Sequence, residues 1–207
     1  MRPAHPRQLG AMVERDMRRW LERAVIGLNL CPFAKAVYIR EQIHFAISWA
    51  MSPQALLRDL VQEMHDLVGL DPAVRDTTLL MAPSCLAEFL DFNDYLGTAD
   101  QALRDLHLDG SIQIASFHPD FQFANTSADD ITNFTNRAPY PTLHLLRESS
   151  VGRAVEAFPQ AESIFERNVQ TMERLGVAGW SALGLGRSVA LPEGGGQNGT
   201  ARGKMAP

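Results

Sequence analysis

Hydrophobic positions follow two periods along the chain, and these periods predict its elements. Four stretches repeat apolar residues every three or four positions, which is the spacing of amphipathic helices; they cover residues 13–28, 52–68, 86–106 and 161–176. Shorter alternating or apolar runs, typical of strands, cover residues 43–49, 77–82 and 111–117. Ser52 and Pro53 supply a hydroxyl cap and a first-turn proline for one helix, and Gly176 is expected to end another.

The order of these elements predicts an α/β fold. Strand, helix, strand, helix, strand in succession favours parallel pairing with right-handed crossovers. We therefore expect layered strand-helix alternation, with a small mainly parallel or mixed sheet of three or four strands and flanking helices. Residues 142–148 alternate like a fourth strand, although they could also begin a helix. One domain is predicted over residues 11–186, between a flexible arm at 1–10 and a disordered tail at 187–207.

A long polar and aromatic segment separates the third strand from residues 142–148. Residues 118–141 are rich in Asn, Asp, Thr and Pro, and loops longer than about 12–15 residues are usually functional or disordered. Its aromatic side chains, among them Phe121, Phe134 and Tyr140, are too many for a solvated linker. We therefore expect an ordered loop folded over a site.

Composition and charge then argue against several classes of function. The net charge of -5 and the isoelectric point near 5.7 argue against a nucleic-acid partner. No apolar run approaches the roughly 18 residues of a membrane-spanning helix, and the first residues lack the apolar core of a signal peptide. Two cysteines are too few for a disulfide framework. We expect a soluble, cytoplasmic protein that acts on a small molecule and has no membrane partner.

Three residues are candidates for nucleophilic or proton-transfer chemistry. Pro32 is expected to open a short helix with Cys31 at its N-cap, where backbone N–H groups and the helix dipole lower a thiol pKa. A buried, inert cysteine is the alternative. His118 and Asp120 directly follow the third strand, where α/β sheets bind ligands, and an aspartate can orient a histidine base. Alternatively, Asp120 only caps its own turn and His118 packs nearby.

His144 adds a metal-binding alternative. With His118 and Asp120 it completes a His-x-Asp…His set, the pattern of the non-haem iron facial triad, so a divalent metal cofactor is one hypothesis. That triad typically sits in a jelly-roll barrel, whereas the strand-helix order here predicts another fold. A single histidine on an apolar strand is also often a core residue.

Arg137 is the first candidate for binding an anionic substrate. Asn136 and Tyr140 flank it in the aromatic loop, and a guanidinium held there could clamp a carboxylate or phosphate with two hydrogen bonds. Arg147 is a further candidate, although ion pairing on a helix surface explains it equally well. The sequence contains no motif of a nucleotide-binding loop, a serine-hydrolase elbow or a zinc protease.

Several segments resemble one protein family. The segments "GLNLCPFAKAV", "IQIASFHPDFQF" and "TNRAPYPTLHLLRE", together with "FERN" and "LGVAGW", are similar to a family of bacteria and some plastid-bearing eukaryotes, domain of unknown function 1415. The resemblance spans roughly residues 12–180. It implies kinship and no particular reaction.

Three hypotheses follow from these residues. The first is an enzyme that acts on a small anionic metabolite, a carboxylate or phosphate, with Cys31, His118 and Asp120 catalytic and Arg137 holding the anion. The second is a metal-dependent enzyme with His118, Asp120 and His144 as ligands. The third is a non-catalytic module whose long loop grips a ligand or partner.

Overall fold

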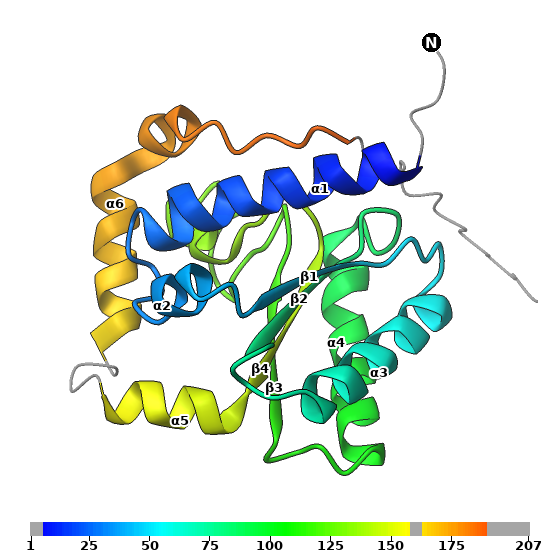
Figure 1. The fold of residues 1–207 in the computed structure, drawn as a ribbon. Coiled ribbons are helices and arrows are strands. Elements are labelled where there is room, and N and C mark those ends of the chain that lie inside the picture. Colours follow the sequence, from blue (N-terminus) through cyan, green and yellow to red (C-terminus); the bar gives the residue numbers. More distant parts are fainter. Residues whose placement is uncertain (1–5, 158–162, 190–207) are drawn as a thin grey trace, which may run out of the picture.

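A four-stranded mixed sheet forms the centre of the protein (Figure 1). The computed structural model describes residues 6–157 and 163–189. In chain order, the helices and strands are α1 (Pro6–Trp20), the π-helix η1 (Leu21–Ile26), α2 (Ala34–Ile39), β1 (Ile43–Ile47), α3 (Pro53–Gly69), β2 (Thr77–Met81), α4 (Phe89–Asp105), β3 (Ile112–Phe117), the 3-10 helix η2 (Ile131–Asn136), β4 (Thr142–Arg147), α5 (Glu148–Glu156) and α6 (Ile164–Ala182).

The strands follow the order β1-β2-β4-β3. β1 and β2 pair in parallel, and β4 lies antiparallel between β2 and β3. β1, β2 and β3 therefore run in the same direction, and all three end at one edge of the sheet, where β4 begins. We call this the carboxyl edge. The predicted α/β class with a mixed sheet is confirmed, and residues 142–147 form the fourth strand rather than the start of a helix.

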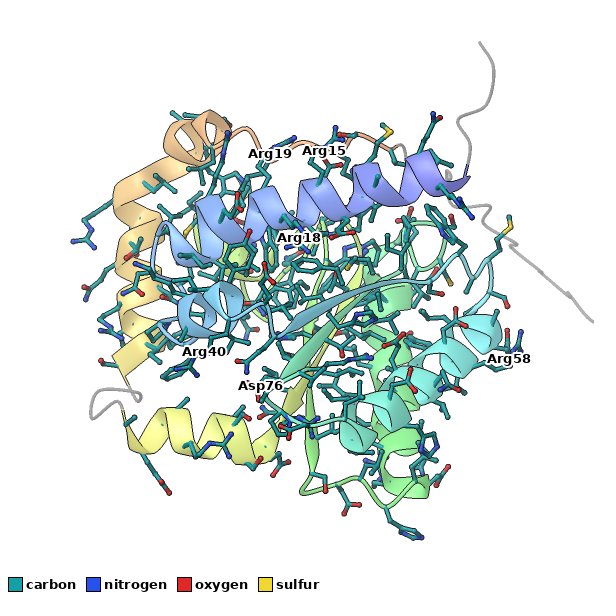
Figure 2. The ribbon with its side chains drawn as sticks, in the orientation of Figure 1. Arg15, Arg18, Arg19, Arg40, Arg58 and Asp76 are labelled. Atoms are coloured by element: carbon teal, nitrogen blue, oxygen red, sulfur yellow. The ribbon has the colours of Figure 1, made fainter. Side chains whose placement is uncertain are left out.

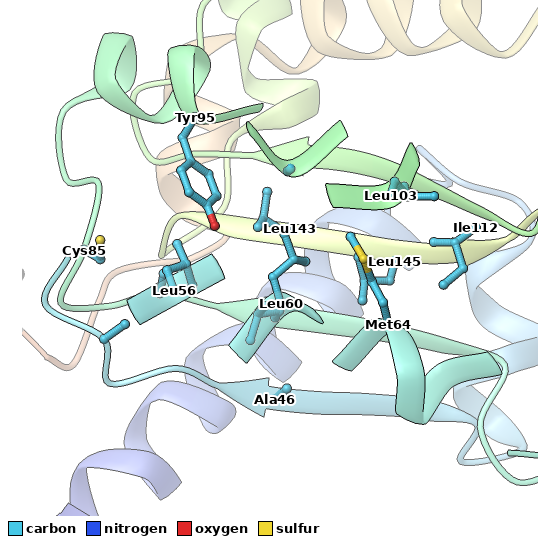
Figure 3. Close-up of a cluster of buried hydrophobic side chains, with 14 of the residues drawn as sticks. Ala46, Leu56, Leu60, Met64, Cys85, Tyr95, Leu103, Ile112, Leu143 and Leu145 are labelled. Carbon is cyan, nitrogen blue, oxygen red and sulfur yellow. The ribbon is translucent and has the colours of Figure 1, made fainter. Parts of the chain in front are cut away.

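Helices α3 and α4 pack on the same face of the sheet (Figure 3). The crossovers from β1 to β2 and from β2 to β3 advance in the same direction, so a common right hand places both helices on one side. Ser52 caps α3 as predicted, because its hydroxyl accepts a hydrogen bond from the Ala55 N–H at 3.3 Å. Leu56, Leu60 and Met64 of α3 are fully buried in this core.

The opposite face is covered by the N-terminal helices. Val13 and Met17 of α1 are fully buried with Leu79 and Met81 of β2 in a second core. Helix α1 begins at Pro6, so residues 6–10 of the predicted arm are helical, and residues 1–5 lie outside the described part. None of the described helices is both long and apolar enough to cross a membrane.

The C-terminal segment returns to α1. In α6 the backbone of Gly176 leaves the helical region, with φ 63°, as the predicted helix end requires, yet the helix resumes and continues to Ala182. Residues 184–189 then run alongside α1 (Figure 1), from near Arg23 to Asp16, and we call them the C-terminal strap. The sequence assigns residues 187–189 to a disordered tail, whereas they belong to this strap; residues 190–207 of that predicted tail lie outside the described residues.

Candidate ligand-binding site

A pocket of about 220 Å³ lies beside the β3–β4 loop, residues 118–141. This loop leaves and re-enters the sheet at the carboxyl edge, which is where α/β sheets bind ligands. The pocket walls come from the end of α1, the loop, the end of α6 and the strap. They are Trp20, Pro119, Asp120, Phe134, Arg137, Ala138, Pro139, Trp180, Leu185, Gly186 and Arg187.

Two polar side chains fix the shape of the β3–β4 loop. Asn133 is fully buried, and its amide oxygen accepts hydrogen bonds from the Phe123 N–H at 2.9 Å and the Thr126 hydroxyl at 2.8 Å. Asp130 caps the 3-10 helix η2 by accepting from the Thr132 N–H at 2.9 Å. These short polar side chains satisfy backbone groups that no strand or helix partner reaches.

Arg137 lies with its guanidinium over the Phe134 ring, 4.1 Å from the centroid. Its Nε donates to the Phe121 carbonyl at 3.2 Å, and its Nη2 donates to the Ala128 carbonyl at 2.6 Å. Burial lowers the pKa of Arg137, and the nearby Asp120 carboxylate acts in the opposite direction. Arg137 is thus held in place by the loop and makes no ion pair within the described residues.

Asp120 and Arg187 are the other charged groups in the pocket walls. Both are exposed to solvent. Across residues 6–157 and 163–189, the Asp120 carboxylate and the Arg187 guanidinium each lack a hydrogen bond or an ion pair. Two positive groups and one negative group therefore face a common space, and two of the three are free to bind a ligand.

Aromatic rings form the apolar part of the pocket. Trp20 donates its indole N–H to the Arg137 carbonyl at 2.8 Å, which ties α1 to the loop. Phe134 and Trp180 meet edge to face, with ring centroids 5.3 Å apart. The rings add a rigid, partly buried boundary to the three charged groups.

His118 belongs to the other side of the sheet. Its ring is completely buried and lies 5.1 Å from the Phe92 ring and 5.5 Å from the Phe89 ring, both in α4. Nδ1 accepts from the backbone N–H of Asp120 at 3.0 Å, so Nε2 carries the proton and donates to the Leu86 carbonyl at 3.1 Å. Burial lowers the pKa of His118. Both nitrogens are occupied, and the Asp120 carboxylate does not orient the ring.

His144 does not join His118 and Asp120. Leu143 and Leu145 of β4 belong to the α3/α4 core, so His144 between them points to the opposite face. There it lies 6.1 Å from the Phe117 ring and hydrogen-bonds Thr77 Oγ1 through Nε2 at 2.7 Å. Among the described residues, no three His, Cys, Asp or Glu side chains are grouped to hold a metal ion. The proposed metal set is therefore not assembled here.

Cys31 also lies apart from the pocket. Helix α2 begins at Ala34, two residues later than expected, so Cys31 is not its N-cap. Burial raises the pKa of the Cys31 thiol, although the backbone N–H groups of Phe33 and Ala34 act against that shift. The thiol packs against the core on the α1 face, whereas His118 faces α4. The predicted Cys31, His118 and Asp120 trio does not converge.

The remaining predicted binding residues hold the fold together. Asn136 donates its side-chain amide to the Ser116 carbonyl at 3.3 Å, and Tyr140 is fully buried. Arg147 pairs with Ile112 in the strand register, so it lies at the edge opposite to the pocket. Its guanidinium donates to backbone carbonyls, including that of Leu70 at 2.6 Å. Of the predicted site residues, only Asp120 and Arg137 meet in the pocket.

The comparisons with known proteins place the chain in a family. The family model described as "Protein of unknown function (DUF1415)" matches residues 12–182. The chain belongs to this family. No curated protein and no solved structure matches it.

Within this DUF1415 chain, sequence reasoning missed several pocket residues. Trp20 has the pattern of an ordinary apolar position in an amphipathic helix, Trp180 lies past the predicted helix at 161–176 in the segment "LGVAGW", and Arg187 falls in the predicted glycine-rich tail. Trp20, Asp120 and Arg137 lie within the matched range, whereas Arg187 lies beyond it. The two aromatic positions have no distinguishing pattern, because a buried helix face and a pocket wall require the same residue types.

A second hollow of about 540 Å³ runs along the outer surface of α1 and η1. Arg15, Arg18 and Arg19, which are labelled in Figure 2, line it together with Arg23, Glu14 and Glu22. Every described wall residue comes from this one helical stretch, so the hollow has a single wall and encloses no ligand. The smaller pocket, with walls from four segments, is the better candidate for the functional site of this DUF1415 chain.

Proposed function

We propose that the protein binds a small anionic metabolite in the pocket beside the β3–β4 loop and exchanges a proton with it. Arg137 and Arg187 bind the carboxylate or phosphate of that metabolite. Asp120 transfers the proton. One observation carries this proposal: two guanidinium groups and one carboxylate, from the β3–β4 loop and the C-terminal strap, line one pocket, and the Asp120 carboxylate and the Arg187 guanidinium make no hydrogen bond or ion pair within the described residues.

The charge balance of the pocket favours an anion. Its walls contain two arginines and one aspartate, which gives a local charge of 2 - 1 = +1, whereas the whole chain carries -5. A positive site within a negative protein concentrates field lines on the pocket and attracts anions locally. Arg137 keeps Nη1 free of hydrogen bonds to the described residues, so it has a donor left for a ligand.

The size of the pocket limits the ligand. A volume of about 220 Å³ corresponds to about seven water molecules in the liquid, and it lies below the roughly 300–1,000 Å³ of sites for drug-sized ligands. We therefore infer a compact ligand with one or two anionic groups. The Phe134 and Trp180 rings provide apolar contact for its uncharged part.

Asp120 is the pocket side chain suited to proton transfer. The other side chains in the pocket walls are aromatic, aliphatic, proline or arginine, and none of these accepts a proton at neutral pH. A carboxylate within reach of a bound ligand can act as a general base and, once protonated, as a general acid. A non-catalytic binding module is the second candidate, and the free charges of the pocket are equally compatible with it.

The test compares anion binding in wild type and Arg187→Gln by titration calorimetry. Inorganic phosphate and benzoate are the probes, and benzyl alcohol is the neutral counterpart of benzoate. A charge-assisted hydrogen bond contributes about 1.5–3 kcal/mol, so we expect Arg187→Gln to weaken binding at least about tenfold. Arg58→Gln, a change at an exposed arginine on α3, is the matched control. Equal affinity in wild type and Arg187→Gln would refute the assignment of Arg187.

Asp120→Asn separates the two candidate functions in the same experiment. If Asp120 shares a proton with the bound anion, wild-type binding takes up a proton, which is measured by repeating the titration in buffers of different ionisation enthalpy. Asp120→Asn then abolishes the proton uptake. If Asp120 only lines the pocket, neither protein takes up a proton, and Asp120→Asn binds the anion more tightly because one negative charge is gone.

A further inference from the structure

The Asp16 carboxylate joins three segments that are distant in sequence. It lies on α1, and its side chain has 0% exposure. Oδ2 accepts a hydrogen bond from the Tyr140 hydroxyl at 2.8 Å and another from the Ser188 N–H at 2.6 Å. Oδ1 accepts from the Ser188 hydroxyl at 2.8 Å, and Arg19 lies 3.5 Å from the same oxygen.

The strap is anchored on both sides of its pocket-lining residues. Before them, Arg23 donates to the Leu183 carbonyl at 2.8 Å, and Gly184 turns the chain with φ 63°. After them, Ser188 binds Asp16 through both its N–H and its hydroxyl. The pocket-lining residues 185–187 are the ones that lie between these anchors.

A buried, ionised carboxylate is stable only when neighbouring groups donate hydrogen bonds to it. An ionised group removed from water must be hydrogen-bonded or paired, since the desolvation penalty otherwise remains uncompensated. Ser188 supplies two of the hydrogen bonds to Asp16. If the strap left α1, both Ser188 hydrogen bonds would be lost, and only Tyr140 and Arg19 would still contact the carboxylate. Asp16 therefore stabilises the conformation in which the strap lies on α1, which we call the seated strap. This conformation places Arg187 at the pocket.

We propose that Asp16 is a positioning residue for Arg187. It acts through Ser188, the residue next to Arg187, and sets the affinity of the pocket for an anion without touching that anion. This inference rests on the proposed function, because it concerns the same pocket. Binding is reciprocal: an anion held by Arg187 stabilises the seated strap to the same extent that the seated strap increases anion affinity.

The proposal differs from a purely structural role in what a mutation changes. A buried carboxylate that only stabilises the fold shifts the melting temperature and leaves the affinity of the folded molecules unchanged. A positioning residue changes that affinity, and the change disappears when Arg187 is absent. Ser188 offers the cleaner variant, because its side chain is exposed and its loss leaves the core intact.

The first measurement is phosphate and benzoate binding to Ser188→Ala, Ser188→Thr and Asp16→Asn. Ser188→Ala removes the hydroxyl bond to Asp16 but keeps the Ser188 N–H bond, so the strap is only partly released and binding should weaken about three- to tenfold. Ser188→Thr should restore the affinity because the hydroxyl returns. The double variant Arg187→Gln/Ser188→Ala should bind no more weakly than Arg187→Gln alone. Unchanged affinity in Ser188→Ala, or full additivity in the double variant, overturns the proposal.

The second measurement is amide hydrogen exchange over residues 185–189 in the free proteins. Exchange should be faster in Ser188→Ala and Asp16→Asn than in wild type, because the strap leaves its seat more often. If wild type binds neither anion, the proposed function fails on its own, and faster exchange still supports the anchoring of Arg187 by Asp16. Unchanged exchange in both variants overturns the anchoring whether or not an anion binds.

Discussion

The two faces of the sheet each bury one tyrosine, and the two hydroxyl groups differ in their hydrogen bonding. On the α1 face the Tyr140 hydroxyl donates to Asp16 at 2.8 Å and accepts from the Val189 N–H at 3.2 Å. On the α3/α4 face the Tyr95 hydroxyl is buried and has no hydrogen-bond partner in the described part of the chain (Figure 3). One hydroxyl connects α1, the β3–β4 loop and the strap, whereas the other ends inside an apolar core.

The two faces of the sheet are stabilised in different ways. The α3/α4 face is built by two crossover helices and carries the larger apolar core, so it supplies hydrophobic stability, and its polar contacts, such as Arg75 to Thr78 at 2.9 Å, lie close together in the chain. The α1 face is covered by segments from both ends of the chain, which need polar contacts to fix their position. Asp16, Tyr140 and Ser188 make these contacts, and the pocket forms where the same segments meet.

The largest expected effect concerns His144, on the α1 face. Burial lowers its pKa to about 4, from an ordinary value near 6.5. Between these two values the unfolded chain binds a proton that the folded protein does not, so stability falls as the pH falls from 6.5 to 4. At about 1.36 kcal/mol per pH unit the loss approaches 3 kcal/mol, an upper bound because the side chain keeps some solvent contact.

Urea unfolding at a series of pH values measures this loss. His144→Gln keeps a donor for Thr77 and does not titrate, so its stability should depend less on pH between 6.5 and 4. His65→Gln, the same change at an exposed histidine on α3, is the control for the substitution itself. The same slope in wild type and His144→Gln would show that His144 does not lose its proton on folding.

The next effect concerns His118, which lies against the α4 face. His118→Gln cannot keep both ring hydrogen bonds, so the Leu86 carbonyl or the Asp120 N–H loses its buried partner. We expect a loss of about 1–3 kcal/mol in the free energy of unfolding, measured in urea. Anion affinity per folded molecule should stay the same, because the ring points away from the pocket.

A different result for His118→Gln would support the proton-transfer role that the sequence suggests for His118. If His118→Gln kept its stability and lost proton uptake on anion binding, His118 would be the proton-transfer group and Asp120 its partner. The two readouts therefore distinguish a buried structural histidine from a catalytic one.

The sequence predicts the regular part of the fold well and the site only in part. Helix and strand positions follow from apolar periodicity, which reflects burial on one face. Asp120 and Arg137 are the two predicted site residues that line the candidate pocket, and the sequence points to them because a long aromatic loop after a strand is typical of a ligand site. His118 was assigned a role that depends on side-chain direction, since the two-residue spacing cannot show that Asp120 offers it a backbone N–H rather than a carboxylate.

Asp16 and Arg187 were missed for a physical reason. Asp16 is one charged residue within a helix that also carries arginines and glutamates, and its burial depends on a strap that begins more than 160 residues later. Arg187 lies beside glycines, which favour disorder when no partner is known. Contacts of this kind are set by tertiary packing and have no local periodicity to reveal them.

The smallest effect is expected for Tyr95→Phe. Tyr95→Phe removes a hydroxyl that has no partner in the described chain, so the free energy of unfolding should change by less than about 1 kcal/mol and should rise rather than fall. Tyr140→Phe is the matched change on the α1 face. It removes a donor from the buried Asp16, so we expect a loss of about 1–3 kcal/mol.

The pair of variants tests the contrast directly, because the same atom is removed from each face. Urea unfolding of both proteins gives the two free energies under one set of conditions. Equal losses in Tyr95→Phe and Tyr140→Phe would mean that the Tyr95 hydroxyl binds something inside the α3/α4 core, such as an ordered water bridging to Cys85 or Asp59. A loss in Tyr140→Phe alone would show that only the hydroxyl on the α1 face supports the fold, because only that face uses polar contacts to seat the strap.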